Sequence, residues 1–291
     1  MPRSNPALAG FDPLFDAELV RRALAEDIGR GDVTTEATIP AETTASGRIV
    51  AREAGVIAGL PAAALAFRLL DSAVRFEPLV REGARVEVGA ALATITGDAR
   101  ALLTAERTAL NFLGHLSGIA TLAFHCQAAI AGTTARVVDT RKTTPGLRNL
   151  EKYAVRTGGA SNHRAGLDDG VLIKDNHIAA CGSIAAAIER ARAHTPHLLK
   201  IEVECETQEQ VREALDAGAD VILLDNMPLD RMRTAVTLIR ERAPHTLIEA
   251  SGGIGADPTK LAAVAATGVD LISLGALTHS APNLDVSLEL D

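Results

Sequence analysis

Six short aliphatic segments recur after residue 132 of this 291-residue chain, and each aliphatic run leads into a polar residue. The segments are RVVDT, GVLIKDNH, LLKIEVE, DVILLDNM, TLIEASGGI and VDLISLGAL. Sequences with helical periodicity lie between most of them, so strand and helix alternate at intervals of roughly 20 to 35 residues. This alternation is typical of parallel βαβ units. Because the strands lack an inside–outside alternation, we expect both faces of the sheet to be buried.

Six such strands can form either an open, doubly wound sheet or a barrel. An open sheet concentrates its ligands at one switch point, whereas a barrel collects site residues from the C-terminal ends of many strands. Nearly every strand end in this sequence carries a candidate site residue, so the pattern favours a barrel.

The N-terminal part has a different composition. All six Phe residues precede residue 130, and a single Tyr is the only aromatic residue beyond it. A helix at about 12–30 is followed by alternating, glycine-punctuated segments that are typical of antiparallel strands. A long apolar helix is then expected over residues 101–130, with Gly114 and Gly118 as candidate breaks. These patterns predict an α+β first domain ahead of the α/β part.

Residues 139–177 concentrate positive charge in an acidic protein. The whole chain has a formal net charge of −8, whereas this segment has seven of the 29 Lys and Arg residues, five acidic residues and a net charge of +2. Such a concentration of cations predicts an anion-binding site. The cations are Arg141, Lys142, Arg148, Lys152, Arg156, Arg164 and Lys174.

The composition argues against several classes of protein. An acidic chain with six Phe, one Tyr and no Trp does not fit a nucleic-acid-binding protein that stacks bases. Cys126, Cys181 and Cys205 are far apart, which predicts neither a disulfide framework nor a zinc site. The N-terminus lacks the apolar core of a signal peptide, and the longest uncharged apolar run, residues 54–67, is too short to span a bilayer. We expect a cytoplasmic protein that binds neither nucleic acid nor membrane.

The ends of the later strands supply acidic residues and glycine-rich turns. Glu202 and Glu204 point to the same face of one strand, and only the later residue lies at the rim, although the sequence leaves open which of them contacts a substrate. Asp225 ends the next strand. The last two strands lead into Ser251-Gly-Gly and Ser273-Leu-Gly, and turns of this kind commonly bind phosphate in barrels. Together with the cations, these groups indicate a polyanionic substrate that carries hydroxyl groups and a divalent metal.

The sequence has no evident Ser/His/Asp or Cys/His triad, no GxGxxG motif after a strand and no GxxxxGK[ST] loop. Without a nucleophile or dinucleotide motif, we expect catalysis by positioning and charge stabilisation.

Long motifs throughout the chain resemble the quinolinate phosphoribosyltransferase family, whose members are also called carboxylating nicotinate-nucleotide pyrophosphorylases. In order, the motifs are EDIGRGDVTTEATIP (26–40), AERTALNFLGHLSGIAT (105–121), TRKTTPGLR (140–148), GGASNHRAGLDDGVLIKDNH (158–177), IEVE (201–204), LLDNM (223–227), EASGGI (249–254) and GVDLISLGALTHS (268–280). The resemblance covers nearly the whole chain, and none of these motifs is broken.

The resemblance implies an N-terminal α/β sandwich domain, residues 1–118, and an open α/β barrel of six or seven parallel strands, residues 119–277. The tail at about 278–291 is expected to pack back on the first domain. The family reaction joins quinolinate and phosphoribosyl pyrophosphate and gives nicotinate mononucleotide, CO₂ and pyrophosphate, a step of NAD biosynthesis. The resemblance also implies a homodimer, or a higher oligomer, whose active sites are shared between subunits.

The resemblance assigns roles to individual residues. The implied catalytic residues are Lys142, Lys174, Glu204 and Asp225. The implied substrate-binding residues are Arg107, Thr140, Arg141, Lys142, His163, Arg164, Lys174, Glu204, Asp225, Ser251, Gly252, Gly253, Ser273, Leu274 and Gly275. Arg107 corresponds to an arginine that the neighbouring subunit contributes.

In this assignment, one group of residues binds quinolinate and a second group binds phosphoribosyl pyrophosphate. Arg141, His163 and Arg164 correspond to the site for the quinolinate carboxylates, and Lys142 and Lys174 span the carboxylates and the pyrophosphate.

Glu204 and Asp225 correspond to the acids near the ribose hydroxyl groups, and residues 251–253 with Gly275 bind the 5′-phosphate. Mg²⁺ is implied to enter with phosphoribosyl pyrophosphate and to lie near these two acids, with no direct protein ligand assigned.

Three alternatives remain open at this point. A phosphoribosyltransferase-like protein of molybdate-transport operons shares the barrel, although the complete NHRAGLDDGVLIKDNH motif argues against it. A Schiff-base lyase could use Lys174, but the neighbouring arginines suit anion binding better. A non-catalytic sensor of nucleotide metabolites is disfavoured because no site residue has been lost.

Overall fold

The computed structural model describes residues 13–291, so the predicted start of the first helix at residue 12 lies outside the described residues. The chain forms two compact units. Unit 1 comprises the residues up to Phe124, residues 144–159 and residues 280–291, and unit 2 comprises residues 125–143 and 160–279. Within the described range, no helix is long and apolar enough to cross a membrane.

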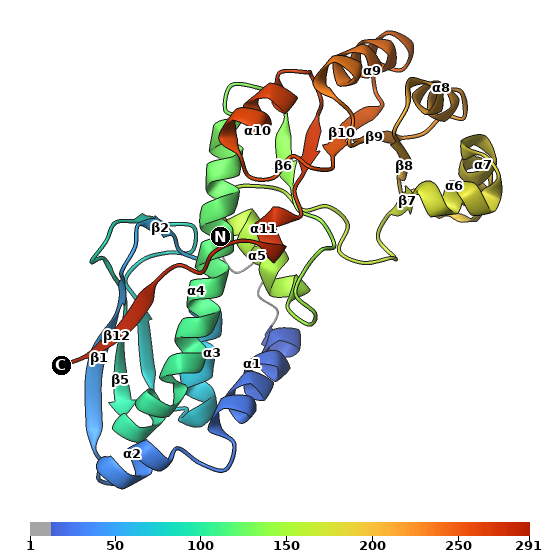
Figure 1. The fold of residues 1–291 in the computed structure, drawn as a ribbon. Coiled ribbons are helices and arrows are strands. Elements are labelled where there is room, and N and C mark those ends of the chain that lie inside the picture. The colour runs from blue at the N-terminus through green and yellow to red at the C-terminus, as the bar shows by residue number, and fades with distance from the viewer. Residues whose placement is uncertain (1–12) are drawn as a thin grey trace, which may run out of the picture. The chain divides into compact units, whose positions relative to one another are not determined.

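A six-stranded parallel sheet forms the centre of unit 2 (Figure 1). Its strands are β6 (Arg136–Val138), β7 (Val171–Ile173), β8 (Ile201–Cys205), β9 (Val221–Asp225), β10 (Leu247–Ser251) and β11 (Leu271–Ser273). The spatial order is β6-β11-β10-β9-β8-β7, so β7 to β11 follow one another and the first strand pairs with the last. A doubly wound sheet would reverse its direction part-way. This order confirms the predicted α/β barrel, which is open between β6 and β7.

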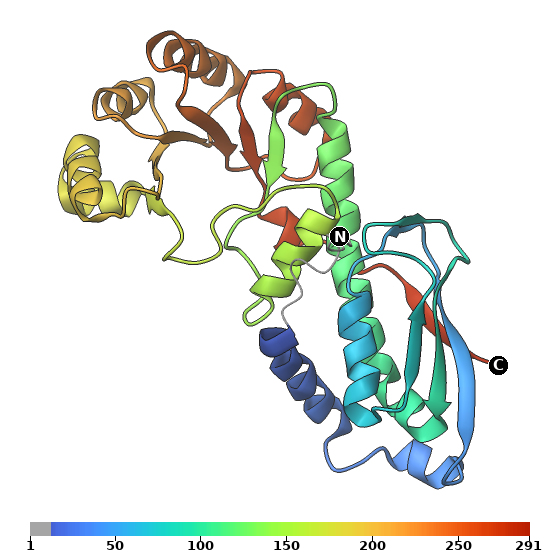
Figure 2. The ribbon, with the colours of Figure 1, turned by 180° about the vertical axis from the view of Figure 1, so that it is seen from behind.

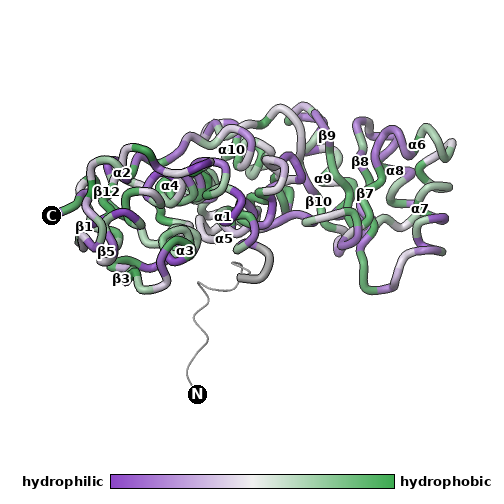
Figure 3. Tube along the Cα trace, turned by 90° about the horizontal axis from the view of Figure 1, so that it is seen from below, coloured by the Kyte–Doolittle hydropathy of each residue, from purple (hydrophilic) through white to green (hydrophobic). Residues whose placement is uncertain are grey.

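Helices follow the strands along the outer side of this sheet (Figures 1 and 2). They are α6 (Asp175–Cys181), α7 (Ile184–His194), α8 (Gln208–Asp216), α9 (Leu229–Arg242), α10 (Pro258–Ala265) and α11 (Ala276–His279). The side chains of Ser183, Thr207 and Asp257 accept hydrogen bonds from first-turn N–H groups and so fix the starts of α7, α8 and α10. The strands are apolar in Figure 3, and residues 221–224 of β9 are buried without interruption, as expected for a sheet covered on both faces.

Unit 1 contains a four-stranded antiparallel sheet in the order β12-β1-β5-β3, and β2 pairs with β4. Its strands are β1 (Thr44–Ala51), β2 (Gly55–Val56), β3 (Arg75–Pro78), β4 (Arg85–Val86), β5 (Ala91–Asp98) and β12 (Val286–Leu290). Its helices are α1 (Pro13–Ile28), α2 (Val33–Thr38), α3 (Leu60–Leu70), α5 (Arg148–Thr157) and most of α4 (Ala99–Ala129). The layer of α3 and α4 beside the sheet gives the predicted α/β sandwich (Figure 1).

Helix α4 is continuous, so the candidate breaks at Gly114 and Gly118 were wrong. Both glycines instead lie against the C-terminal segment at residues 282–284. That segment leads into β12, which pairs antiparallel with β1 in unit 1.

The two units differ in detail from the predicted domains 1–118 and 119–277. Helix α4 passes from unit 1 to unit 2 after Phe124, and α5 belongs to unit 1 although it lies between β6 and β7 in the sequence. Polar contacts explain the second difference, because the Tyr153 hydroxyl group donates a hydrogen bond to Glu82 of unit 1. His115 Nε2 of α4 also lies 3.0 Å from the Oε1 atom of Glu151 on α5.

Candidate active site

A cleft of about 480 Å³ lies at the C-terminal ends of the parallel strands in unit 2. Twelve of the fifteen residues implied to bind substrates line it. They are Thr140, Arg141, Lys142, His163, Arg164, Lys174, Glu204, Asp225, Ser251, Gly252, Gly253 and Ser273. The parallel sheet explains this convergence, because each of these residues ends a strand or follows one, and all such ends meet at one edge.

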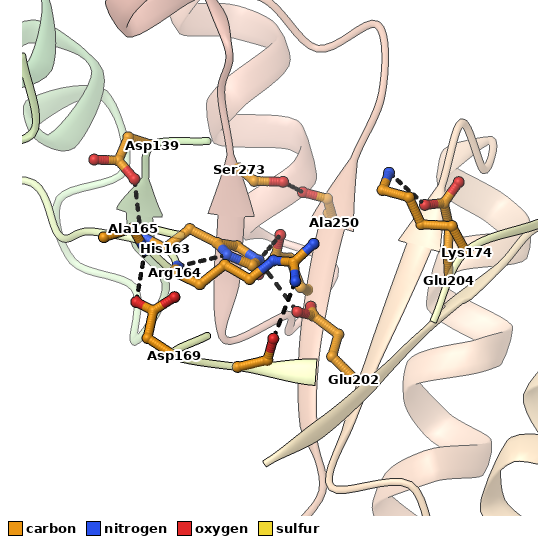
Figure 4. Close-up of polar contacts among 12 residues, drawn as sticks. Asp139, His163, Arg164, Ala165, Asp169, Lys174, Glu202, Glu204, Ala250 and Ser273 are labelled. Atoms are coloured by element: carbon orange, nitrogen blue, oxygen red, sulfur yellow. Dashed lines mark hydrogen bonds and ion pairs between the residues drawn. The ribbon is translucent and has the colours of Figure 1, made fainter. Parts of the chain in front are cut away.

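An ion pair joins the ends of β7 and β8. Lys174 Nζ lies 2.9 Å from Glu204 Oε2, and the lysine side chain is half-exposed whereas the glutamate is mostly covered (Figure 4). The backbone N–H of Lys174 donates to His177 Nδ1 at 2.9 Å, which fixes the start of α6. The pair places one cation and one carboxylate side by side at the rim of the cleft.

The loop between β6 and β7 carries His163 and Arg164. Asp139 is fully buried, and its Oδ1 atom accepts the backbone N–H of His163 at 2.8 Å. Arg164 Nη1 donates to the Gly170 carbonyl oxygen at 3.0 Å, and Asp169 accepts the N–H of Ala165 (Figure 4). These bonds hold the loop so that its basic side chains line the cleft.

Two arginines dominate the charge at this end of the cleft. Burial, followed by the like charge of Arg141, lowers the pKa of the Arg164 guanidinium group. Two guanidinium groups that repel each other are stabilised when an anion binds between them. This part of the cleft is therefore suited to carboxylate groups.

The turn after β10 packs against the end of β9. Gly252 has φ of +87°, and a Cβ atom there would lie 2.3 Å from Asn226 Oδ1. The backbone N–H of Asn226 donates to the Ser251 carbonyl oxygen at 2.9 Å, and its side-chain amide donates to Asp225 Oδ2 at 2.6 Å. The close fit leaves a turn of bare backbone facing the cleft, as a phosphate site requires.

The remaining predicted residues lie elsewhere. Leu274 is buried, and its N–H donates to the Val138 carbonyl oxygen at 2.9 Å. Gly275 lies next to the cleft, where an added Cβ atom would be 3.0 Å from the Lys142 Cδ atom. Arg107 belongs to unit 1 and is exposed on α4.

Sequence reasoning missed four residues of the cleft, Leu172, Leu223, Asn226 and Glu249. Glu249 is 1% exposed in the middle of β10, and a charged residue within an aliphatic strand is itself a signal, because buried acids are rarely unpaired. Asn226 has φ of +51°, a conformation that an Asn directly after a strand can adopt.

Two family models match nearly the whole chain. The description of the first is the C-terminal domain of quinolinate phosphoribosyl transferase, matched over residues 119–289, and that of the second is the N-terminal domain, matched over residues 32–117. This chain belongs to the quinolinate phosphoribosyl transferase family.

Relatives and solved structures agree with this assignment to the quinolinate phosphoribosyl transferase family. A probable nicotinate-nucleotide pyrophosphorylase (carboxylating) of Synechocystis sp. is 51% identical over 267 residues, covering 92% of this chain and 90% of the relative. The nicotinate-nucleotide pyrophosphorylase (carboxylating) of Mycobacterium leprae is 48% identical, with coverage of 95% and 98%. The crystal structure of NadC from Streptococcus pyogenes is 43% identical with a TM-score of 0.91, covering 97% of this chain and 98% of that one.

Proposed function

We propose that this member of the family transfers the phosphoribosyl group of phosphoribosyl pyrophosphate to quinolinate, with loss of one carboxylate as CO₂. The products are nicotinate mononucleotide, CO₂ and pyrophosphate, in NAD biosynthesis. One observation carries the proposal: a single cleft gathers paired arginines, two lysines, two rim acids and a bare glycine turn. The names of relatives that are 46–51% identical support the same reaction.

The arginine end of the cleft suits quinolinate. Quinolinate has two adjacent carboxylates, and a guanidinium group grips a carboxylate through two parallel hydrogen bonds. Arg141 and Arg164 provide two such groups, and Lys142 adds a third positive charge. His163 lines the same end.

The opposite side of the cleft suits the phosphoribosyl group. Ser251 to Gly253 offer backbone N–H groups and a hydroxyl group to the 5′-phosphate, and Ser273 lies at the end of the next strand. Glu204 and Asp225 end β8 and β9, where carboxylates can accept hydrogen bonds from ribose hydroxyl groups.

The chemistry requires little beyond positioning and charge. The ring nitrogen of quinolinate is a free nucleophile that attacks C1 of the ribose while pyrophosphate leaves. Positive charge grows on the ribose ring, and Glu204 and Asp225 stabilise it, while Lys142 and Lys174 stabilise the departing anion. The pyridinium ring that results withdraws electrons from C2, which allows the C2 carboxylate to leave as CO₂.

Mg²⁺ fits the donor atoms of this site. Hard cations prefer carboxylate and phosphate oxygens, and the substrate itself supplies the phosphates. Asp225 would hold the ion, because Glu204 is already paired with Lys174 whereas Asp225 accepts a hydrogen bond from the neutral Asn226 amide. When bound, Mg²⁺ neutralises part of the charge on pyrophosphate.

The ion pair also bears on the lyase alternative. A Schiff-base lysine must be neutral to attack a carbonyl group, whereas Lys174 lies 2.9 Å from a carboxylate that favours its charged form. This geometry favours anion binding over covalent catalysis.

We propose further that the protein is a cytoplasmic homodimer, or a higher oligomer, in which Arg107 enters the neighbouring subunit's cleft. The exposure of Arg107 on α4 supports its contribution to the neighbouring subunit's cleft. The free thiols of Cys126, Cys181 and Cys205 support a reducing compartment. Light scattering of the purified protein measures the assembly, and cell fractionation measures the location.

Product analysis tests the reaction. We expect quinolinate, phosphoribosyl pyrophosphate and Mg²⁺ to give nicotinate mononucleotide with equal amounts of CO₂ and pyrophosphate. Nicotinate in place of quinolinate is expected to give no product. A folded protein that makes no nucleotide from quinolinate would contradict the proposal and favour the transport-operon homologue.

A further inference from the structure

Two buried carboxyl groups lie beneath the arginine end of the cleft. Glu202 on β8 is 7% exposed and Glu249 on β10 is 1% exposed, and an oxygen atom of each carboxyl group lies within 4.8 Å of the other. His163 Nε2 lies 3.1 Å from Glu202 Oε2 (Figure 4). The same nitrogen lies 3.7 Å from Glu249 Oε1. Two buried carboxyl groups this close together repel each other when both are charged, so the pair retains one proton inside the barrel.

The histidine beside the pair is fixed in one form. Its Nδ1 atom accepts the backbone N–H of Arg164 at 2.7 Å and therefore carries no proton. Its Nε2–H is then free to donate to Glu202, and the ring is neutral. The proton on the carboxyl pair is therefore additional to the one on the imidazole ring.

The two carboxyl groups face different cavities. Glu249 lines the substrate cleft, whereas Glu202 lines a second cavity of about 280 Å³. The second cavity lies at the opposite, N-terminal ends of β7, β8 and β9, next to Val171, Lys200 and Val221. His163 and Arg164 line both cavities. The carboxyl pair thus bridges the two ends of the barrel.

The proposed reaction needs a proton at this place. When the C2–carboxylate bond breaks, CO₂ leaves and the bonding electron pair stays on C2 of the pyridinium ring. A proton must then bond to C2 to give nicotinate mononucleotide, and Glu249 lines the same cleft as the arginines proposed to hold the carboxylates.

We propose that Glu249 donates the proton that replaces CO₂ at C2, and that Glu202 resupplies it from the cavity at the N-terminal end of the barrel. This inference depends on the proposed function. In each turnover Glu249 loses its proton to C2 and becomes a carboxylate. It regains a proton from the neighbouring Glu202 carboxyl group, which in turn takes a proton from water in the second cavity.

The electrostatics of the pair agree with this role. Burial, followed by the charge of Glu202, raises the pKa of Glu249 well above its usual range, against the smaller lowering effects of His163 and Ser273. Glu249 is therefore protonated at neutral pH, and in that state it does not repel the substrate carboxylates.

The substitution Glu249→Gln keeps the shape of the side chain and removes its transferable proton. Single-turnover reactions measure pyrophosphate, ¹⁴CO₂ from quinolinate labelled in the C2 carboxylate, and the undecarboxylated mononucleotide. Because the electron pair left on C2 bonds again to CO₂ unless a proton reaches it, we expect pyrophosphate to form at nearly the normal rate while net CO₂ release slows about 100-fold, as for loss of a general acid. The mononucleotide of quinolinate then accumulates. The matched control Glu241→Gln, at an exposed position of α9, is expected to release both products equally and at the normal rate.

A second variant blocks the second cavity, from which Glu202 takes its proton, and leaves Glu202 and Glu249 unchanged. Leu199→Trp places a larger side chain in the second cavity. Because one proton is already stored, we expect a normal first turnover, and in later turnovers we expect CO₂ release to become slower than pyrophosphate release. If Glu249→Gln does not fold, this variant decides the question. Equal release of CO₂ and pyrophosphate in the folded variants, with an active wild type, overturns the proton route alone. A wild type that makes no nucleotide overturns the proposed function and the route with it.

Discussion

Residue by residue, the proposed phosphate turn depends on a close fit between Gly252 and the Asn226 side chain, which belong to separate sequence motifs. Gly252 adopts φ of +87°, and its missing side chain leaves room for the Asn226 amide, which would otherwise be 2.3 Å from a Cβ atom. The Asn226 amide in turn donates to Asp225. A substitution at residue 252 therefore disturbs both the proposed phosphate turn and the proposed metal-proximal acid.

We predict that Gly252→Ala raises the KM for phosphoribosyl pyrophosphate at least tenfold, because strain and the clash with Asn226 displace the turn. Steady-state kinetics with each substrate varied in turn measure the effect. The control Gly218→Ala has the same type of strain, with φ of +74°, but an added Cβ atom there meets nothing within 4 Å. Equal losses in the two variants would mean that the turn itself has no special role.

The sequence identified the residues of the cleft that follow strands, because strand ends can be counted from the aliphatic pattern. It missed Glu249, whose role depends on Glu202 and His163 from other parts of the chain. It also listed Leu274 among the substrate-binding residues, and in the structure the N–H of Leu274 donates to the Val138 carbonyl oxygen. Such pairings between distant segments are not encoded in local patterns.

Among the elements, helix α4 and the C-terminal strand β12 form one structural unit. Gly114 and Gly118 lie one turn apart on α4, and the backbone of residues 282–284 packs directly on them. A Cβ atom at Gly118 would lie 1.9 Å from the Pro282 carbonyl oxygen. Glycines that the sequence indicated as helix breaks are thus sites of close backbone approach.

We predict that Gly118→Ala displaces residues 282–290 and lowers the melting temperature by about 5 °C, the effect of overpacking by about 2 kcal/mol. Hydrogen exchange of β1 and β12 should rise, because the pairing of Gly47 with Leu290 weakens. Asn111→Ala, at an exposed position of the same helix, serves as the control and is expected to leave exchange unchanged. Unchanged protection of β12 in the Gly118 variant would contradict this account.

Helix α5 shows where element-level prediction stops. Its residues fall within the predicted barrel domain, 119–277, between two barrel strands. The buried acid Glu151 and the hydroxyl group of Tyr153 instead find partners in unit 1, at His115 and Glu82. Only the identity of these distant partners decides which unit the helix joins.

For the whole molecule, the chain passes between its units several times, and the cleft itself draws its lining from unit 2. Arg107 differs from the other implied binding residues because it belongs to unit 1 and is exposed. An exposed guanidinium group can be contributed to a second copy of the chain. This arrangement makes a homodimer with shared sites testable by mixing variants.

We predict that Arg107→Ala lowers turnover about 100-fold, as expected for loss of a charge-assisted contact, and leaves the melting temperature unchanged. When subunits of the Arg107→Ala and Lys142→Ala variants are mixed at random in equal amounts, half of the dimers contain one subunit of each. Each of these mixed dimers has one intact site and one site that lacks both residues. The mixture should therefore recover about a quarter of wild-type activity. Lys142→Ala mixed with Lys174→Ala is the matched control, because both residues line the same cleft of unit 2 and no intact site can form. Absence of recovery in purified Arg107–Lys142 mixed dimers, isolated with two different affinity tags, would place Arg107 outside the neighbouring subunit's site.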